Sequence, residues 1–299
     1  MRVLIVGSSG MIGSSLVRYF HQCGVEVIRL FRCGTSNISE NFCWDPISGK
    51  IEKKYLENLD AIINLAGDSV ASGRWTPKKK KKIWDSRVIG TQNLCKALSE
   101  VNYPPKVLIN ASAIGYYKNS GDLPIDENGT LGNSFLSSVC QDWELATKAA
   151  EERGIRVVKL RIGTVLALEG GALKKMLPVF KAGFGGKIGS GAQYISWIAL
   201  EDLISIIKFC IDNTLARGPI NAVAPIPVTN ITFTKTLGNV LHRPTFIPLP
   251  AFVVRFFLGE MGEELLLQGP KVIPKKLEEL GFSFKYPNIE EALNAILKK

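Results

Sequence analysis

The first 160 residues alternate between short runs of consecutive apolar residues and longer segments with apolar residues at helical spacing. Runs without polar–apolar alternation are typical of strands buried on both faces of a parallel sheet. The helical segments cover 11–23, the stretch after Pro77 and the stretch around Trp143; the strand segments are RVLIV (2–6), VEVIRL (25–30), DAIINLA (60–66), KVLINASA (106–113) and IRVVKLR (155–161). A repeated strand–helix order predicts an α/β fold with a doubly wound, parallel, Rossmann-like sheet.

The pattern changes after residue 168. Glycine-rich turns, EGGA and FGGKIGSGAQ, precede helical segments broken by prolines at 225, 227, 244, 248 and 250. The tail shows three helical patterns, AFVVRFFLGEM, PKKLEELGF and IEEALNAILKK. We predict a first domain over 1–247, with a smaller substrate lobe inserted mainly after residue 168, and a C-terminal helical cap over 248–299.

Composition favours a globular protein with a large core, since 46% of the 299 residues are hydrophobic. No run approaches the roughly 18 apolar residues that a membrane span needs. The first apolar run begins at residue 3, which leaves no room for the basic start of a signal peptide. We expect a cytoplasmic protein with no membrane contact.

Cysteine and histidine are too scattered for a metal centre. The six cysteines form no C-x-x-C pair, and the two histidines, His21 and His242, lie far apart in the chain. We expect neither a zinc site nor a disulfide framework. A Ser-His-Asp hydrolase is also disfavoured, because both histidines fall at predicted helical segments and are expected to be structural.

The net charge of +10 includes one run of five lysines at 78–82. The run follows Thr76 and Pro77, a good N-cap and first helical residue. A solvated helix face is the simplest interpretation. An anionic ligand such as a nucleotide phosphate is the alternative, and nucleic acid ranks behind both, because only Trp75 and Trp84 flank the run as stacking residues.

A glycine-rich turn, GSSGMIG, follows the first strand segment and opens the first helical segment. In a strand–turn–helix unit, Gly7 permits the tight turn, Gly10 lets the backbone approach a pyrophosphate, and Gly13 lets the helix pack close to the strand. The helix N-terminus then faces the phosphate. The turn therefore predicts a dinucleotide site.

The second strand segment is followed by Phe31 and Arg32, not by the acidic residue that binds a ribose 2′-hydroxyl. A guanidinium offers a fork of donors that suits a 2′-phosphate. Arg32 therefore favours NADP over NAD, and a plain surface arginine is the alternative.

These motifs together resemble the extended short-chain dehydrogenase/reductases. More narrowly, the chain resembles their atypical epimerase-like branch, often labelled nucleoside-diphosphate-sugar epimerase or cell-division inhibitor, which carries a C-terminal helical domain. The matching segments run nearly end to end: the glycine turn, DAIINLAG (Asp60–Gly67), Arg74, Trp75, Ser86 and Arg87, NASA (Asn110–Ala113), Tyr116 and Tyr117, RIGTVL (Arg161–Leu166), IGSG (Ile188–Gly191), SWI (Ser196–Ile198) and QGPKVIPKK (Gln268–Lys276).

The resemblance implies NADP as cofactor and a set of residues that contact it. Arg87 also fits on its own, since its helix leaves the carboxyl edge of the sheet, where ligands bind. Lys82 is one of five consecutive lysines, any of which could face the phosphate. The implied contacts are Gly7, Ser9, Gly10, Met11, Ile12 and Gly13 in the turn, Arg32, Leu65, Ala66, Lys82, Arg87 and Val165.

The usual proton relay of the superfamily is missing. Ordinary members place a Tyr and, four residues later, a Lys on one helix face, and no Tyr-x-x-x-Lys occurs in this chain. Counting back from Glu144, which resembles the acidic residue that follows that lysine, the two positions hold Leu136 and Cys140. Lys148 lies about 12 Å further along a helix, too far to replace the cation.

Other residues could supply the proton. Ser112 matches the substrate-orienting serine of the superfamily, and Tyr116 and Tyr117 follow in the next loop. A phenol there could reach a substrate carbonyl, although a tyrosine that only packs the loop is equally ordinary. Cys140 is expected to be an inert, buried thiol.

Two functional hypotheses follow from these residues. The first is an NADP-dependent oxidoreductase or isomerase acting on a small substrate of unknown identity without the usual Tyr and Lys. The second is a non-catalytic NADP(H)-binding regulatory or cell-division-associated protein, for which a protein partner is conceivable by analogy. Nucleic-acid binding through the lysine run is not expected.

Overall fold

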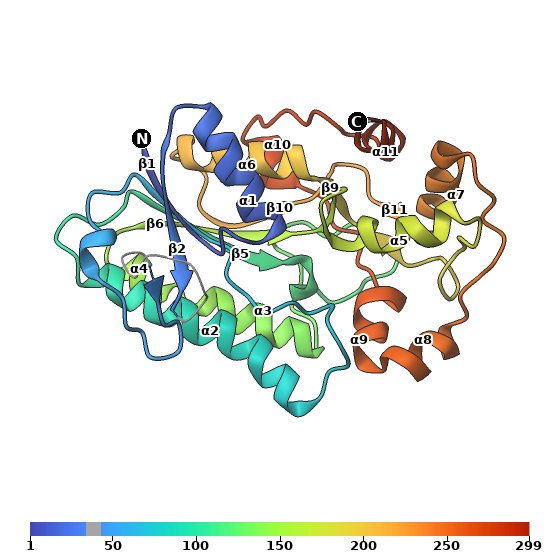
Figure 1. Ribbon diagram of the computed structural model, residues 1–299, viewed down its shortest axis with the longest axis horizontal. Coiled ribbons are helices and arrows are strands. Elements are labelled where there is room, and N and C mark those ends of the chain that lie inside the picture. The colour runs from blue at the N-terminus through green and yellow to red at the C-terminus, as the bar shows by residue number, and fades with distance from the viewer. Residues whose placement is uncertain (34–42, 299) are drawn as a thin grey trace.

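In the computed structural model, which describes residues 1–33 and 43–298, a seven-stranded sheet forms the centre of the molecule (Figure 1). Its strand order is β10-β6-β5-β4-β1-β2-β3, and all six pairings are parallel. The strands are β1 (Arg2–Val6), β2 (Glu26–Arg32), β3 (Cys43–Trp44), β4 (Ala61–Asn64), β5 (Val107–Ala113), β6 (Arg156–Ile162) and β10 (Gly218–Ala222). The predicted doubly wound α/β fold is confirmed.

Helices cover both faces of this sheet (Figure 1). Within β1, Val3 and Ile5 pack into one core, and Leu4 and Val6 pack into the other. All four are almost fully buried, which is why this strand shows no polar alternation. One face carries α1 (Met11–Gln22) and α6 (Leu200–Asp212); the other carries α2 (Pro77–Ser99), α3 (Phe135–Leu145) and α4 (Lys148–Glu152).

The start of α2 is as the sequence predicted. The Thr76 hydroxyl accepts a hydrogen bond from the Lys79 amide at 3.2 Å, and Pro77 is the first helical residue. Because proline lacks the N–H that would be unsatisfied at this position, it fits there without cost. The lysine run 78–82 therefore lies within the first turns of α2.

Beyond the sheet, short strands and helices form a layer over its carboxyl edge. The C-terminal segment returns to this edge, where the buried Val272 pairs with Ile125. The helical patterns of the tail are confirmed. The elements are β7 (Thr164–Leu166), α5 (Gly171–Lys181), β8 (Tyr194–Ile195), β9 (Trp197–Ala199), β11 (Val228–Thr229), α7 (Asn230–Leu241), α8 (Ala251–Leu258), α9 (Glu260–Gly262), a π-helical turn η4 (Glu263–Leu267), α10 (Lys275–Glu279) and α11 (Ile289–Leu297).

One disulfide joins Cys33 and Cys43, although the sequence offered no reason to expect a disulfide framework. The pair follows from the sheet: β2 and β3 are neighbours with Phe31 opposite Cys43, so the two cysteine Cα atoms lie 4.9 Å apart. Spacing in sequence did not reveal this proximity. The other cysteines, Cys23, Cys95, Cys140 and Cys210, are free.

The described residues contain neither a candidate membrane-spanning helix nor a candidate metal-binding group. No helix within 1–33 and 43–298 is long and apolar enough to cross a bilayer. In the same part of the chain, no three or more His, Cys, Asp or Glu side chains gather as a metal-binding group.

Candidate functional site

The glycine turn between β1 and α1 forms a tight cradle. Gly7 has a left-handed φ of +82°, and a Cβ there would lie 2.9 Å from the Leu65 carbonyl carbon. A Cβ at Gly13 would lie 2.3 Å from the Gly7 oxygen. Only glycine fits at these two positions, because backbone atoms cannot move aside.

Gly10 has a different role in the same turn. A Cβ there would meet only the Gly7 oxygen, at 3.5 Å, so the turn is open above it. Gly10 is also the N-cap of α1 and gives no side-chain cap to the first N–H groups. The turn therefore offers backbone donors to an anionic group, as a dinucleotide pyrophosphate requires.

A cavity of about 510 Å³ lies at the carboxyl edge of the sheet. Such edges hold the ligands of open α/β sheets. Its strand-end half includes Ile12, Leu65, Arg87, Ser112, Cys140, Thr164 and Val165. Its outer half includes Ile114, Leu136, Val139, Met176, Ile188, Gln193, Tyr194, Ser196, Asn230, Phe233, Glu264, Gln268 and Pro270.

Among the predicted cofactor residues, Arg87 has the most distinctive surroundings. Its guanidinium donates to the Asp68 carbonyl at 2.9 Å and lies 5.1 Å from the centre of the Trp143 ring. Gly67 makes room for it, since a Cβ there would be 2.9 Å from Cζ of Arg87. Burial lowers its pKa, and no carboxylate of the described chain lies in ion-pair contact with it.

The lysine run is engaged in local ion pairs. Lys82 contacts Asp68 at 3.1 Å, Lys79 contacts the same carboxylate, Lys80 contacts Glu260, and Lys81 contacts Asp85. The run is a solvated helix face only in part, because the Lys79 and Asp68 side chains are each 16% exposed and Lys80 reaches Glu260 of the C-terminal segment. Lys82 does not line the cavity in the described structure, and its cofactor contact stays a prediction.

Arg32 is exposed at the end of β2, beside Trp44 of β3. It lies on the same sheet edge as the glycine turn, because β1 and β2 are parallel neighbours. Its predicted contact with a 2′-phosphate stays a prediction.

Ser112, at the end of β5, lines the cavity and is held by a buried polar network. Its hydroxyl donates to Glu144 Oε1 at 2.8 Å. Arg161 donates hydrogen bonds to the same carboxylate from two nitrogens, at 2.8 and 2.9 Å. Burial alone would lower the pKa of Arg161, but its hydrogen bonds with Glu144 raise that pKa above the ordinary value. Arg161 therefore holds the Glu144 carboxylate in position as the acceptor for Ser112.

The two tyrosines lie outside the cavity. Tyr117 is buried; its hydroxyl donates to Asn221 Oδ1 at 2.6 Å and accepts from Arg161 at 2.8 Å. Burial raises the pKa of Tyr117 to about 12. The Tyr116 ring lies under the Arg161 guanidinium, 3.6 Å from its centre. A proton-donor role for Tyr116 or Tyr117 is a prediction that this arrangement does not support.

The positions of the missing pair face the cavity. Leu136 and Cys140, on one side of α3, both line it with Val139 between them. Cys140 is buried, and burial raises the pKa of its thiol to about 12, so it is a neutral thiol as expected. The cavity wall is therefore apolar where a phenol and an ammonium would stand.

Sequence reasoning missed two charged residues at this site. Glu264, in η4, accepts hydrogen bonds from the Phe135 and Leu136 amides, both at 3.1 Å, and so caps α3 from the far end of the chain. No local pattern signals this contact. Arg161 could have been noticed, since it lies near the carboxyl end of a predicted parallel strand, the edge at which ligands bind.

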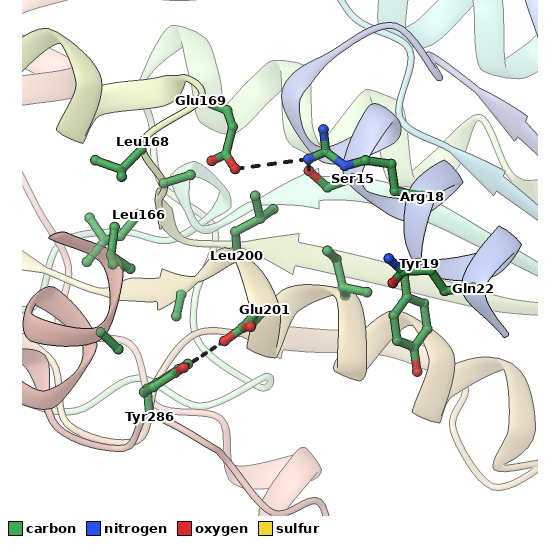
Figure 2. Close-up of a pocket in the computed structure, with 15 residues that line it drawn as sticks. Ser15, Arg18, Tyr19, Gln22, Leu166, Leu168, Glu169, Leu200, Glu201 and Tyr286 are labelled. Carbon is green, nitrogen blue, oxygen red and sulfur yellow. Dashed lines mark hydrogen bonds and ion pairs between the residues drawn. The ribbon is translucent and has the colours of Figure 1, made fainter. Parts of the chain in front are cut away.

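A second cavity, of about 320 Å³, lies between α1, α6 and the C-terminal segment (Figure 2). Its polar side chains already have partners: Arg18 lies 4.0 Å from Glu169, and the Tyr286 hydroxyl donates to Glu201 at 2.7 Å. It does not include the glycine turn. The carboxyl-edge cavity is therefore the better candidate for a dinucleotide and its substrate.

Comparison with known families covers most of the chain. The model of the NAD dependent epimerase/dehydratase family matches residues 3–222. The model of a domain of unknown function, DUF1731, matches residues 249–296. The glycine cradle and the cavity both fall mainly within the first match.

Individual relatives agree with these matches. An epimerase family protein of Mycobacterium bovis is 43% identical over 291 residues, which is 97% of this chain and 96% of the relative. The chloroplastic SDR39U1 homolog of Arabidopsis thaliana is 36% identical over 306 residues, covering 100% and 87%. The crystal structure of human SDR39U1 (isoform 2) with NADPH has a TM-score of 0.90 and 34% identity, covering 100% and 99%.

Proposed function

The chain belongs to the NAD dependent epimerase/dehydratase family, and on this basis we propose that it binds NADP(H) and exchanges hydride with a small substrate, as an oxidoreductase or isomerase. One observation carries the proposal: the glycine cradle and the cavity at the sheet edge are continuous, since Ile12 of the turn and Ser112 line the same space. The similarity to a human protein solved with NADPH supports the choice of cofactor.

The residues present fit this cofactor. The turn 7–13 would hold the pyrophosphate, Arg32 the 2′-phosphate, and Leu65 and Val165 the apolar faces of the rings. When bound, the nicotinamide supplies or accepts a hydride. Arg87 and Cys140 line the same cavity, so α2 offers a cation to the space where α3 lacks its lysine. We assign Arg87 to the oxygens of the nicotinamide-side ribose.

Ser112 orients the substrate in this proposal. Its hydrogen is committed to Glu144, so its oxygen presents lone pairs to the cavity and can accept a hydrogen bond from a substrate hydroxyl. When a carbonyl binds instead, the serine hydroxyl must turn toward it. The Glu144–Arg161 pair then keeps the serine oxygen in place.

Arg32→Ala tests the cofactor assignment. We expect the dissociation constant for NADPH to rise about tenfold or more, because a guanidinium–phosphate contact is lost, while the constant for NADH changes little. Calorimetric titration of both cofactors measures this. Arg217→Ala, which removes an exposed arginine far from the turn, is the matched control. An equal loss for both cofactors would contradict the assignment of Arg32.

The absent Tyr and Lys favour a second candidate, a regulatory protein that binds NADP(H) without chemistry. It predicts a protein partner whose capture depends on the cofactor. Pull-down with the purified chain, with and without NADPH, tests this. A partner retained only with NADPH, together with no hydride transfer, would favour regulation; capture that ignores NADPH would count against it.

A further inference from the structure

The walls of the outer half of the cavity are mainly apolar, with polar side chains between them, and this lining indicates the class of substrate. Resting on the hydride-transfer function proposed above, we propose that this half binds a small, uncharged, largely apolar carbonyl compound or its alcohol, and that it does not accept a sugar nucleotide. Leu136, Val139, Met176, Ile188 and Phe233 form its walls. Apolar walls stabilise a ligand that buries apolar surface against them. They offer a diphosphate neither a charge partner nor a hydrogen bond.

A diphosphate would find no free cation in this half. Among the described residues that line the whole cavity, Arg87 is the only Lys, Arg or His, and it lies in the strand-end half, under Gly67. Proteins that hold phosphates use Arg, Lys or unoccupied backbone N–H groups. The cation that is present is already assigned to the cofactor.

The N-terminus of α3, which borders the cavity, is also occupied. At the start of α3, the Ser137 amide donates to the Ser134 hydroxyl, and the Phe135 and Leu136 amides donate to Glu264. The Glu264 carboxylate lines the cavity and stands where an anion would bind. Its negative charge would repel a phosphate. The outer half therefore disfavours anions for two reasons, the lack of a free cation among the described residues and the presence of this carboxylate.

Three polar side chains of the outer half are hydrogen-bonded within the protein. The Gln193 amide donates to the Ile188 and Leu266 carbonyls, at 3.0 and 2.8 Å. Ser196 donates to the Pro270 carbonyl at 2.8 Å, and Asn230 Oδ1 accepts from the Ile188 amide at 2.8 Å. A sugar ring needs several hydroxyl partners, and at these three side chains it would have to compete with the bonds already made within the protein.

The reaction balances for such a substrate. Reduction converts one carbonyl compound, one NADPH and one proton into an alcohol and NADP⁺. The carbonyl carbon gains the hydride and its oxygen gains the proton, which comes from solvent by way of the open cavity mouth. The reverse reaction oxidises the alcohol with NADP⁺ and returns the proton to solvent.

The test compares two classes of ligand on the full chain. NADPH binding is first measured by calorimetry. If NADPH does not bind, this result contradicts the proposed function, not the proposed class of substrate. On the NADP⁺-loaded protein, cyclohexanol and UDP-glucose are then titrated separately, and NADPH consumption is followed with cyclohexanone and 9,10-phenanthrenequinone. We expect saturable binding of the alcohol, turnover of at least one carbonyl, and no binding of UDP-glucose at millimolar concentration.

Leu136→Asn makes the test specific to this cavity. We expect the KM for the uncharged carbonyl to rise about tenfold with an unchanged NADPH dissociation constant, because a polar side chain replaces apolar wall. Leu145→Asn is the matched control on the same helix, where Leu145 is 63% exposed, and it should behave as wild type. Saturable binding of UDP-glucose, no binding of either uncharged probe, or equal effects of the two substitutions would overturn the proposal.

Discussion

At the scale of single residues, a buried ion pair behind the cavity positions Ser112. The side chains of Glu144 and Arg161 are 9% and 4% exposed, and each is the ion-pair partner of the other. Burying an unpaired charge is costly, so neither can be removed alone without penalty. The pair therefore makes the orientation of Ser112 part of the stability of the fold.

Arg161→Met should destabilise the protein by about 3–5 kcal/mol, because it leaves the Glu144 carboxylate buried and unpaired. Urea unfolding at neutral pH measures the loss. The double variant Glu144→Leu with Arg161→Met is the control and should recover much of it, since no charge then remains buried. A loss below about 1 kcal/mol for the single variant would mean that water replaces the partner.

The backbone part of the site could be predicted from the sequence more readily than its side-chain part. Gly7 and Gly13 are demanded by local backbone crowding, which a motif encodes directly. Tyr117 was a reasonable candidate by position, but its hydroxyl turns to Asn221, 104 residues away. Such a contact depends on the tertiary fold, and no local pattern reveals it.

At the scale of elements, a few side chains join strands that are distant in sequence. Asp60, just before β4, accepts from the Arg2 amide and from Lys106, both at 2.8 Å, and so ties β1 to the start of β5. The hydrogen bond from Lys106, followed by that from the Arg2 amide, lowers the pKa of Asp60 below its ordinary 3.8. The folded state therefore favours the ionised carboxylate.

The lowered pKa of Asp60 determines how its contribution to the stability of the protein changes with pH. A carboxyl with a lowered folded pKa stabilises the protein above its unfolded pKa, and that stability is lost as the pH falls toward the folded value. Asp60→Asn should therefore flatten the fall in stability below about pH 4, and Lys106→Met should flatten it too, because it removes the main cause of the shift. Urea midpoints across this acid range measure the slopes. Slopes equal to that of wild type would contradict the assignment.

Elements were predictable where they are long and periodic. The apolar runs at β1, β4, β5 and β6, and the capped start of α2, coincide with the predicted segments. The two-residue strands β3, β8 and β11 were not predicted, since so few residues carry no periodicity. The Cys33–Cys43 disulfide was missed for the same reason, because it depends on the pairing of β2 with β3.

At the scale of the whole molecule, the cavity is completed by the end of the chain. The strand-end half belongs to the sheet, whereas Glu264 and Pro270 reach the outer half from the C-terminal segment. Val272 is fully buried against the first part of the chain, with Tyr117, Ile125 and Val223 in its cluster. The cavity is therefore lined by residues of both family matches, most of them within 3–222 and a few, such as Glu264 and Pro270, within 249–296.

The structure of the complex with NADPH tests the central claim most directly. We predict the pyrophosphate on the turn 7–13, the 2′-phosphate at Arg32, and the nicotinamide in the strand-end half, with its C4 atom facing the apolar space beside Leu136 and an open path to Ser112. A nicotinamide outside the cavity, or a C4 face sealed by Leu136 and Val139 with no room for a second molecule, would contradict hydride transfer and leave NADPH as a regulatory ligand.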